Sequence, residues 1–354
     1  MAGAAPAPTP TPAYAIEAGE VGLDRERVLA IWRGNLGRDS RMQAKYDWFY
    51  ASCPYGEPLL CLLRHLPDGS LVGAAAAGPR RMLRQGAEIG AGVLVDLAVT
   101  TEHRSLGPAL MLQSALADAG CRRYGLIYGF PNPKAAAVFK RVGYAKLGEI
   151  VRHARVLRHA RYVARRLPRL LAPLAGAVLD ARARLRDAWR TRGAARLDAT
   201  WTDRADPRFD ALWARSDHGD ALVAVRDAAF ASWRFDASPL ANTRYLLLSD
   251  PADRGLRAWF ACQAEDGVLH VRDFWSDDAA QGISEAFVDA LLRTARRDGH
   301  VAVSVEYAGA ETKLAGWHAA GFIERSRRPV FGRWADASAT ESVELHLTSA
   351  DEDE

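Results

Sequence analysis

The chain has 354 residues and carries 47 Lys and Arg against 43 Asp and Glu, which leaves a formal net charge of +4. This length allows two domains, and a hydrophobic fraction of 49% is ordinary for a soluble globular protein. The mild positive charge does not indicate a nucleic-acid partner, and we expect none.

Residues 1–14 are rich in Ala, Pro and Thr and lack the basic and apolar regions of a signal peptide, which predicts a disordered tail. The four cysteines form no C-x-x-C pair, and the nine histidines form no zinc motif. We therefore expect no bound metal and a reducing, cytoplasmic environment. No feature of the sequence predicts an oligomeric state.

The segment from Val99 to Leu110 carries the strongest functional signal. It follows an apolar run, residues 93–99, that predicts a strand, and it opens a helical pattern, residues 108–119. The first amides of a helix lack intrahelical partners, and the helix dipole favours an anion there. Gly107 permits close approach to the backbone, and Pro108 suits a first helical turn. The segment therefore predicts a cradle for a phosphate or pyrophosphate.

A second motif follows a second predicted strand, residues 124–130. It begins with Asn132 and Ala135, continues through Phe139 and a basic pair, and ends at Gly143, which predicts a left-handed helix cap before an aromatic residue. The two motifs occur in a fixed order, each after a predicted strand.

Together the motifs resemble those of the GCN5-related N-acetyltransferases (GNAT). Arg104-x-x-Gly107-x-Ala109 resembles the pyrophosphate loop of that family, and Asn132-x-x-Ala135 resembles its second motif. The resemblance covers residues of about 20 to 157 and implies an α/β fold of the GNAT type, with acetyl-CoA or another acyl-CoA as cosubstrate. It also implies that the strand before the loop separates from its neighbour and leaves a gap for the thioester.

The resemblance assigns a donor site residue by residue. The strand backbone would contact the pantetheine arm, the loop would hold the pyrophosphate, and the second motif would touch the cofactor arm. The residues are Leu97, Ala98, Val99, Arg104, Ser105, Leu106, Gly107, Pro108, Ala109, Asn132 and Phe139.

The acid and base are the open part of the mechanism. Asp96 is the one carboxylate within the apolar strand, where burial is costly unless the group is hydrogen bonded or functional, so it is our first candidate base. The alternative is a structural hydrogen bond to a neighbouring loop. Glu88 is the second candidate base. Many family members have a Tyr where this chain has Phe139, which cannot donate a proton; Tyr128 or solvent would then protonate the thiolate.

Residues 152–192 carry twelve arginines, and the apolar residues Leu167, Leu170, Leu171, Leu174 and Val178 fall on one helical stripe. Two interpretations stay open for this arginine-rich bridge. The stripe packs between two domains, which we favour, or residues 158–192 contact an anionic membrane surface.

The second half appears, by eye, to repeat the first in its order of elements. We expect two tandem mixed-sheet domains joined by a helical bridge: a disordered tail (1–14), a catalytic GNAT domain (15–157), the bridge (158–197), a degenerate GNAT-like domain (198–345) and a solvated acidic tail (346–354). The segment that matches the anion loop is Ala279 to Gly282, flanked by Asp277 and Asp278, and two carboxylates repel a phosphate. The second copy is therefore expected to bind no cofactor.

These features predict an acyl-CoA-dependent N-acyltransferase, most simply an N-acetyltransferase, that acts directly on a primary amine of a small molecule or amino sugar. The aromatic segment 45–56 lies where such acceptors bind; we interpret its rings as core, with stacking on a sugar as the alternative. Two other functions stay open: a non-catalytic binding or scaffold protein, and a transferase that uses aminoacyl-tRNA or acyl carrier protein as donor.

Overall fold

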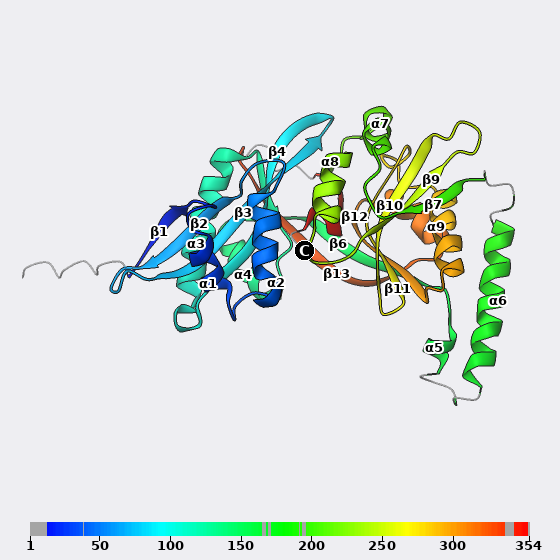
Figure 1. Cartoon of the computed structure of the whole chain (residues 1–354), viewed down its shortest axis with the longest axis horizontal. Coiled ribbons are helices and arrows are strands. Elements are labelled where there is room, and N and C mark those ends of the chain that lie inside the picture. Colours follow the sequence, from blue (N-terminus) through cyan, green and yellow to red (C-terminus); the bar gives the residue numbers. More distant parts are fainter. Residues whose placement is uncertain are drawn as a thin grey trace, which may run out of the picture.

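The computed structural model describes residues 13–37, 39–164, 168, 171–190, 192, 196–336 and 343–352. The molecule is elongated, with its N-terminal half at one end and its C-terminal half at the other (Figure 1). Tyr14 opens the first strand, so the predicted disordered tail does not extend to residue 14. Residues 1–12 lie outside the described part of the chain.

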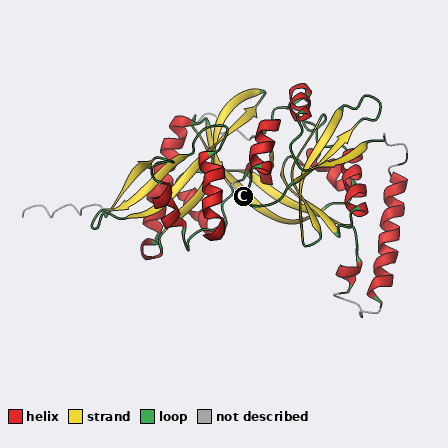
Figure 2. Cartoon of the chain, viewed as in Figure 1, coloured by secondary structure: helices red, strands yellow, loops and turns green. Residues whose placement is uncertain are grey.

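The described strands form one mixed sheet, and helices pack on its faces (Figure 2). The α/β prediction is confirmed. The strands are β1 (Tyr14–Gly19), β2 (Leu59–His65), β3 (Leu71–Arg84), β4 (Ala87–Val99), β5 (Leu126–Gly129), β6 (Ala145–Val156), β7 (Asp198–Thr202), β8 (Leu222–Ala224), β9 (Arg244–Ser249), β10 (Leu256–Glu265), β11 (Val268–Ser276), β12 (Ala302–Ala308), β13 (Ile323–Trp334) and β14 (Leu345–Thr348).

Helices occupy most of the connections. The α-helices are α1 (Arg25–Trp32), α2 (Asp39–Tyr46), α3 (Leu106–Arg123), α4 (Pro133–Arg141), α5 (Ala160–Val163), α6 (Ala172–Arg190), α7 (Arg208–Arg215), α8 (Ala228–Ala231), α9 (Glu285–Arg297) and α10 (Ala315–Ala319). Shorter turns of π or 3₁₀ type are η1 (Asp47–Ala51), η2 (Thr101–His103), η3 (Ser232–Asp236), η4 (Glu311–Leu314) and η6 (Ser349–Asp351).

The strand order shows that the two halves do not have separate sheets. It runs β1-β2-β3-β4-β5-β13-β6-β12-β11-β10-β9-β7. Strand β6 follows the N-terminal half in sequence but pairs with β12, whereas β13 follows the C-terminal half but pairs with β5. The last long strands of the two halves are therefore exchanged, and they pair with each other in the middle of the sheet.

The two halves run through a similar order of elements, and one contact at their junction is reciprocal. The indole N–H of Trp48 in η1 donates to the backbone oxygen of Trp233 in η3 at 2.7 Å, and the indole of Trp233 donates to the oxygen of Trp48 at 3.2 Å. Each residue thus contacts its counterpart as residues around a two-fold axis do. The rings of Trp48, Phe49 and Tyr50 are buried, as the core interpretation of this segment expected.

The arginine-rich bridge does not pack between the halves. Helix α6 lies on the outer side of the C-terminal half (Figure 1), and Leu171, Leu174 and Val178 are exposed. The favoured interpretation of this stripe is therefore wrong for these three residues, because the face of α6 that contacts the protein is a different one. Leu167 and Leu170 lie outside the described residues.

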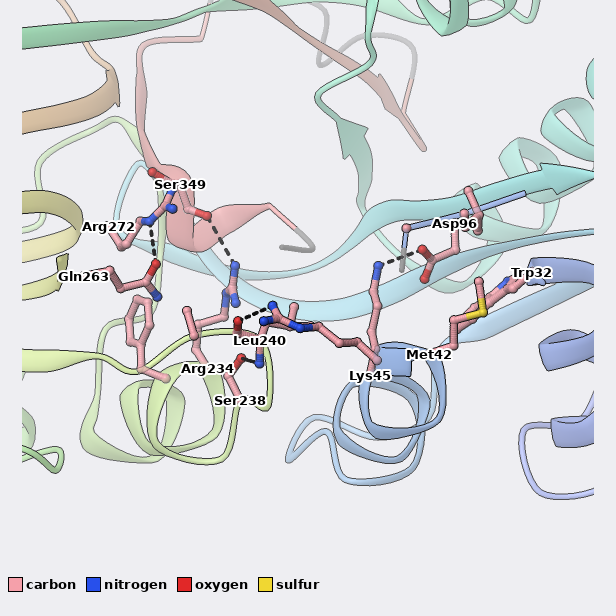
Figure 3. Close-up of a pocket in the computed structure, with 15 residues that line it drawn as sticks. Trp32, Met42, Lys45, Asp96, Arg234, Ser238, Leu240, Gln263, Arg272 and Ser349 are labelled. Atoms are coloured by element: carbon pink, nitrogen blue, oxygen red, sulfur yellow. Dashed lines mark hydrogen bonds and ion pairs between the residues drawn. The ribbon is translucent and has the colours of Figure 1, made fainter. Parts of the chain in front are cut away.

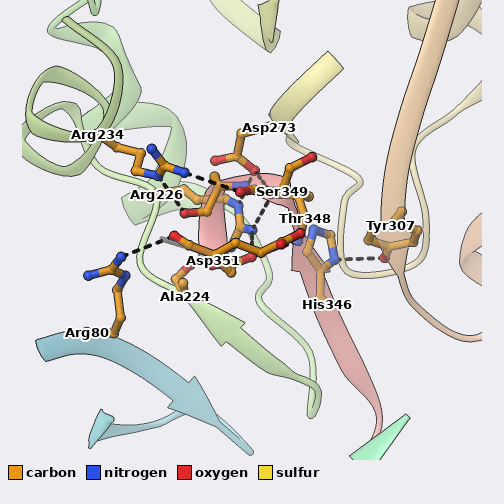
Figure 4. A network of polar contacts seen from close by, with 12 residues as sticks. Arg80, Ala224, Arg226, Arg234, Asp273, Tyr307, His346, Thr348, Ser349 and Asp351 are labelled. Atoms are coloured by element: carbon orange, nitrogen blue, oxygen red, sulfur yellow. Dashed lines mark hydrogen bonds and ion pairs between the residues drawn. The ribbon is translucent and has the colours of Figure 1, made fainter. Parts of the chain in front are cut away.

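The acidic end of the chain is buried rather than solvated as far as Asp351, and Glu352 is half-buried. Asp351 has an exposed fraction of 0% and forms an ion pair with Arg226 at 2.8 Å. Arg226 also contacts Asp273 at 2.9 Å, and the three side chains lie where the two halves meet (Figure 4). The expectation of a solvated tail overlooked that a buried cation at the junction needs these carboxylates. Asp353 and Glu354 lie outside the described residues.

Candidate active site

The site is organised by a separation of strands in the N-terminal half. Strand β4 pairs with β5 in parallel only from Ala91 to Val93, although β4 continues to Val99. Beyond this point β4 keeps its hydrogen bonds to β3 alone. The two strands therefore separate beyond Val93, as the resemblance implies.

A bulge in β4 lies beside this gap. The register against β3 shifts between Val95 and Ala98, and Asp96 has a φ of 53°. A left-handed conformation is uncommon for a residue other than glycine and is typical of positions that surrounding contacts hold in place. Bulges of this kind turn a side chain toward a site and free the backbone from its ladder.

Asp96 is held at this bulge by two side chains of the N-terminal half. Its carboxylate accepts a hydrogen bond from the Lys45 ammonium at 2.8 Å and from the Tyr50 hydroxyl at 3.0 Å. Its side chain is only 6% exposed. Lys45 comes from α2 and Tyr50 from η1, so the aromatic segment positions the carboxylate as well as filling the core.

Asp96 also lines a cavity of about 370 Å³ at the junction of the two halves (Figure 3). One wall comes from α1 and α2, and the other from η3, the loop 238–241, β10, β11 and η6. Among the described residues that line it, four are basic, Arg41, Lys45, Arg234 and Arg272, and one, Asp96, carries a carboxylate.

Two arginines of this cavity, Arg41 and Arg272, donate to neutral oxygens. Arg41 donates to the backbone oxygen of Leu240 at 2.7 Å, and Arg272 donates to the side-chain oxygen of Gln263 at 2.8 Å. Arg234 donates to the backbone oxygen of Ala350 at 2.9 Å. Neutral acceptors do not cancel a guanidinium charge, so Arg41 and Arg272 favour an anionic group in the cavity.

The predicted anion cradle lies at the start of α3, directly after β4. Ser105 is the N-cap residue, but its side chain does not cap the helix. Gly107 has open space where a side chain would begin, and Arg104 is exposed with its guanidinium directed to the oxygens of Val99 and Asn35. The first-turn amides and a neighbouring cation are thus accessible to a phosphate, which fits a diphosphate-bearing donor.

The second motif has a structural contribution. Asn132 accepts a hydrogen bond from the amide of Ala135 at 3.0 Å and so caps α4. Phe139 is buried, with its ring 4.8 Å from that of Tyr144 and 6.1 Å from that of Phe331 in β13. It also contacts the space beside Gly129, at the point where β5 leaves β4. Phe139 therefore packs behind the gap.

The structure does not bring the other two candidate acid–base residues to Asp96. Glu88 lies at the opposite end of β4 and forms an exposed ion pair with Arg81, which lowers the pKa of the Glu88 carboxyl. Tyr128 is fully buried, and its hydroxyl donates to the backbone oxygen of Asp351 at 3.0 Å. Burial raises the Tyr128 pKa. Neither side chain lines the cavity.

The corresponding turn of the C-terminal half is closed by its own residues. The carboxylate of Asp278 accepts a hydrogen bond from the backbone amide of Ser284, at the start of α9. It accepts a second one from the hydroxyl of Ser276. A β-carbon on Gly282 would lie 2.6 Å from the backbone of Lys313, so another segment fills the space that is open at Gly107. A carboxylate therefore occupies the helix start before α9, whereas the amides at the start of α3 are accessible.

Sequence reasoning missed the half of the cavity that the C-terminal segments supply. Arg234, Arg272 and Ser349 occur in no recognisable motif, and only the tertiary arrangement brings them near Asp96. Lys45 and Tyr50 did carry a signal, because both belong to the aromatic segment after the first helices.

Comparison with solved structures identifies the fold. The chain superimposes on a GCN5-related N-acetyltransferase from Anabaena variabilis with a TM-score of 0.62 at 10% identity, covering 91% of this chain and 73% of that one. A GCN5-related N-acetyltransferase from Kribbella flavida gives 0.59 at 14% identity, covering 92% and 72%. The chain has the GNAT fold.

The N-myristoyltransferase of Saccharomyces cerevisiae, solved with bound myristoyl-CoA, has the same fold at a lower TM-score of 0.50, with 11% identity and coverage of 92% and 80%. No protein-family model matches the sequence, and no curated protein matches it. The compared structures cover nine-tenths of this chain, so the structural similarity extends over both halves.

Proposed function

We propose that this protein is an acyl-CoA-dependent N-acyltransferase, with acetyl-CoA as the simplest donor and a primary amine of a small molecule as acceptor. One observation carries the proposal: a single strand, β4, ends in an open anion cradle and bears a buried carboxylate that faces a cavity three residues earlier. Donor and acceptor would therefore meet at the β4 bulge. The GNAT fold of the chain supports this assignment.

The donor would bind with its diphosphate at the first turn of α3 and beside Arg104. The pantetheine arm would follow Leu97, Ala98 and Val99 in the gap between β4 and β5, where the strand lacks a partner on that side. Backbone amides freed by the bulge are suited to polarise a carbonyl oxygen. Each of these contacts fixes the thioester close to Asp96 and so favours direct transfer.

The acceptor would enter the basic cavity with its amine toward Asp96. The amine nitrogen attacks the thioester carbonyl carbon, a C–N bond forms, and the C–S bond breaks to release the CoA thiolate. Asp96 accepts the proton that the nitrogen loses, directly or through water. Phe139 has no proton to donate, so water protonates the thiolate.

Calorimetric titration with acetyl-CoA tests the donor site. Arg104→Glu, which places a negative charge at the cradle, is expected to abolish binding, whereas Arg122→Glu, the same charge change at the other end of α3, leaves it intact. Thiol release that depends on an added amine then tests transfer. A folded protein that binds no acetyl-CoA at millimolar concentration, or that accepts acyl groups only from aminoacyl-tRNA or acyl carrier protein, contradicts the proposal.

A further inference from the structure

Helix α6 presents an apolar face to solvent. The exposed fractions are 69% for Leu174 and 72% for both Leu185 and Trp189, and Leu171 and Val178 are exposed as well. These positions follow one another at helical spacing, so they form a single outer stripe on the helix. A monomeric soluble protein rarely leaves such a row of large apolar side chains uncovered.

The opposite face fixes α6 to the protein, so the stripe is not exposed by a loosely attached helix. Asp187 pairs with Arg155 at 2.6 Å and with Arg296 at 2.7 Å. Gly176 contacts Ala160 so closely that a β-carbon would lie 2.6 Å from its backbone. The orientation of the helix is therefore set by buried contacts.

A basic pocket of about 380 Å³ lies between α6 and the ends of β6 and β13. Its lining includes Arg155, Arg182, Arg186 and Arg325, and no carboxylate is among the described residues that line it. Arg155 is 4% exposed, and its Nη1 has no hydrogen-bond partner within the described structure although the atom is buried. A buried guanidinium nitrogen without a partner is costly, and together the four arginines give the pocket a positive charge that favours an anion.

We infer that the outer face of α6 docks on an anionic phospholipid bilayer, with a headgroup phosphate in the arginine pocket and the apolar stripe at the level of the acyl chains. Arg182 and Arg186 lie between the stripe and the pocket, and Arg184 lies on the other side of the stripe, so cations flank the apolar face as in interfacial helices. No described helix combines the length and apolar character needed to cross a bilayer, so the contact would be peripheral.

A second copy of the chain fits this surface less well. Two such stripes facing each other would bring their flanking arginines together, and like charges at an interface repel. An anionic lipid surface instead supplies the missing negative charge along the whole helix. This inference uses neither the cavity at Asp96 nor the donor cradle, so it stands apart from the proposed function.

Vesicle sedimentation with the full chain tests the inference. We expect binding to vesicles of phosphatidylcholine with one-third phosphatidylglycerol, at least tenfold weaker binding to phosphatidylcholine alone, and loss of binding at high salt. Leu185→Asp and Arg182→Glu/Arg186→Glu should each weaken binding at least tenfold. The matched control is Leu23→Asp, because Leu23 is 77% exposed in the N-terminal half.

Three results would overturn the inference. Equal binding to both vesicle types removes the role of charge. Saturable binding of inorganic phosphate without any vesicle binding makes the pocket a site for a free anion. Sedimentation equilibrium that shows a dimer disrupted by Leu185→Asp, without lipid binding, assigns the stripe to a second copy.

Discussion

Asp96 combines a strained backbone with a paired carboxylate. Its φ of 53° persists because Lys45 and Tyr50 hold its side chain, and the β4 bulge places it at the cavity wall. A strained residue that neighbouring contacts fix is typical of a functional position. The chemistry of the site is therefore expected to depend on this carboxylate more than on any other described side chain in the cavity.

Asp96→Asn is expected to lower kcat at least about 100-fold while acetyl-CoA still binds, because the amide retains the shape but cannot accept the proton. Steady-state thiol release and calorimetry measure the two effects. Tyr50→Phe is the matched control: it removes one hydrogen bond to the carboxylate and should cost far less. An Asp96→Asn variant with unchanged kcat would assign Asp96 to a structural role.

The basic lining predicts the chemistry of the acceptor. Arg272→Gln should raise KM about tenfold for amines that carry a carboxylate or phosphate and leave KM for neutral amines unchanged, since a charge-assisted hydrogen bond to the anion is lost. Arg244→Gln serves as control, because Arg244 is an exposed arginine on β9, which β10 separates from β11. Equal changes for both amine classes would show that Arg272 only supports the pocket wall.

Among single residues, those of the expected donor site are easier to recognise in the sequence than those of the expected acceptor cavity. The cradle from Arg104 to Ala109 is contiguous, so its residue types and its place between a strand and a helix are visible in one dimension. Asp96 stands out because a carboxylate is unexpected in an apolar strand. Arg272 and Arg234 are far from Asp96 in sequence, and an arginine on a strand or helix is usually a solvated surface residue.

Among the elements, the C-terminal segment β14–η6 shows how a surface-like sequence becomes core. The acidic residues at 351–354 predict a solvated tail, but η6 lies between the halves, where Arg226 and Arg234 contact its residues and Arg80 contacts the backbone oxygen of Glu352 (Figure 4). Composition shows that these residues are acidic, but it does not show which distant arginines neutralise their charge in the folded chain. For the same reason, the amphipathic pattern of α6 was visible in the sequence but the partner of its apolar face was not.

Asp351→Ala should lower the free energy of unfolding by about 3 kcal/mol, because it removes one of the two carboxylates that balance the fully buried Arg226. Urea unfolding measures the change. Asp253→Ala, which removes an exposed ion pair with Arg257, should cost less than about 1 kcal/mol. Similar losses for both variants would mean that the buried network does not stabilise the junction.

For the whole molecule, exchange of β6 and β13 joins the halves into one folding unit. From local pattern the sequence predicts the strands at residues 93–99 and 124–130 and a repeated order of elements, but neither β6 nor β13. The sequence cannot predict the exchange of β6 and β13. The alternation of side chains in β6 would be compatible with pairing beside strands of either half. Only the complete set of strand pairings reveals it.

A chain interrupted between α6 and β7 is expected to yield soluble protein only when both pieces are expressed together. Alone, the N-terminal piece lacks β13 and exposes the edge of β5, which invites aggregation. Co-purification of a tagged N-terminal piece with the untagged C-terminal piece measures this. A soluble, monomeric N-terminal piece with a cooperative thermal transition would show that the halves fold independently.

Stability should fall on mild acidification because of His346. Burial holds the pKa of this imidazole well below 6.5 in the folded chain, whereas the unfolded chain protonates it near 6.5. The unfolded state therefore binds more protons below pH 6.5, and stability present above that pH is lost as the pH falls.

The loss attributable to His346 approaches about 1.4 kcal/mol per pH unit below pH 6.5. Urea midpoints at pH 7.5, 6.5 and 5.5 measure it. His346→Gln retains a side chain able to bond the Tyr307 hydroxyl but does not titrate, so its stability should depend less on pH. An unchanged slope in this variant would assign the pH dependence to other groups.

The pairing of β13 with β5 has a consequence for how this protein can change over generations. Phe331 of β13 contacts Phe139, which packs behind the expected thioester position, so a residue of the C-terminal half supports the expected donor site of the N-terminal half. Recombination that imported a foreign second half would have to deliver a compatible strand as well as a compatible cavity wall. The coding regions for the two halves are thus expected to be inherited together.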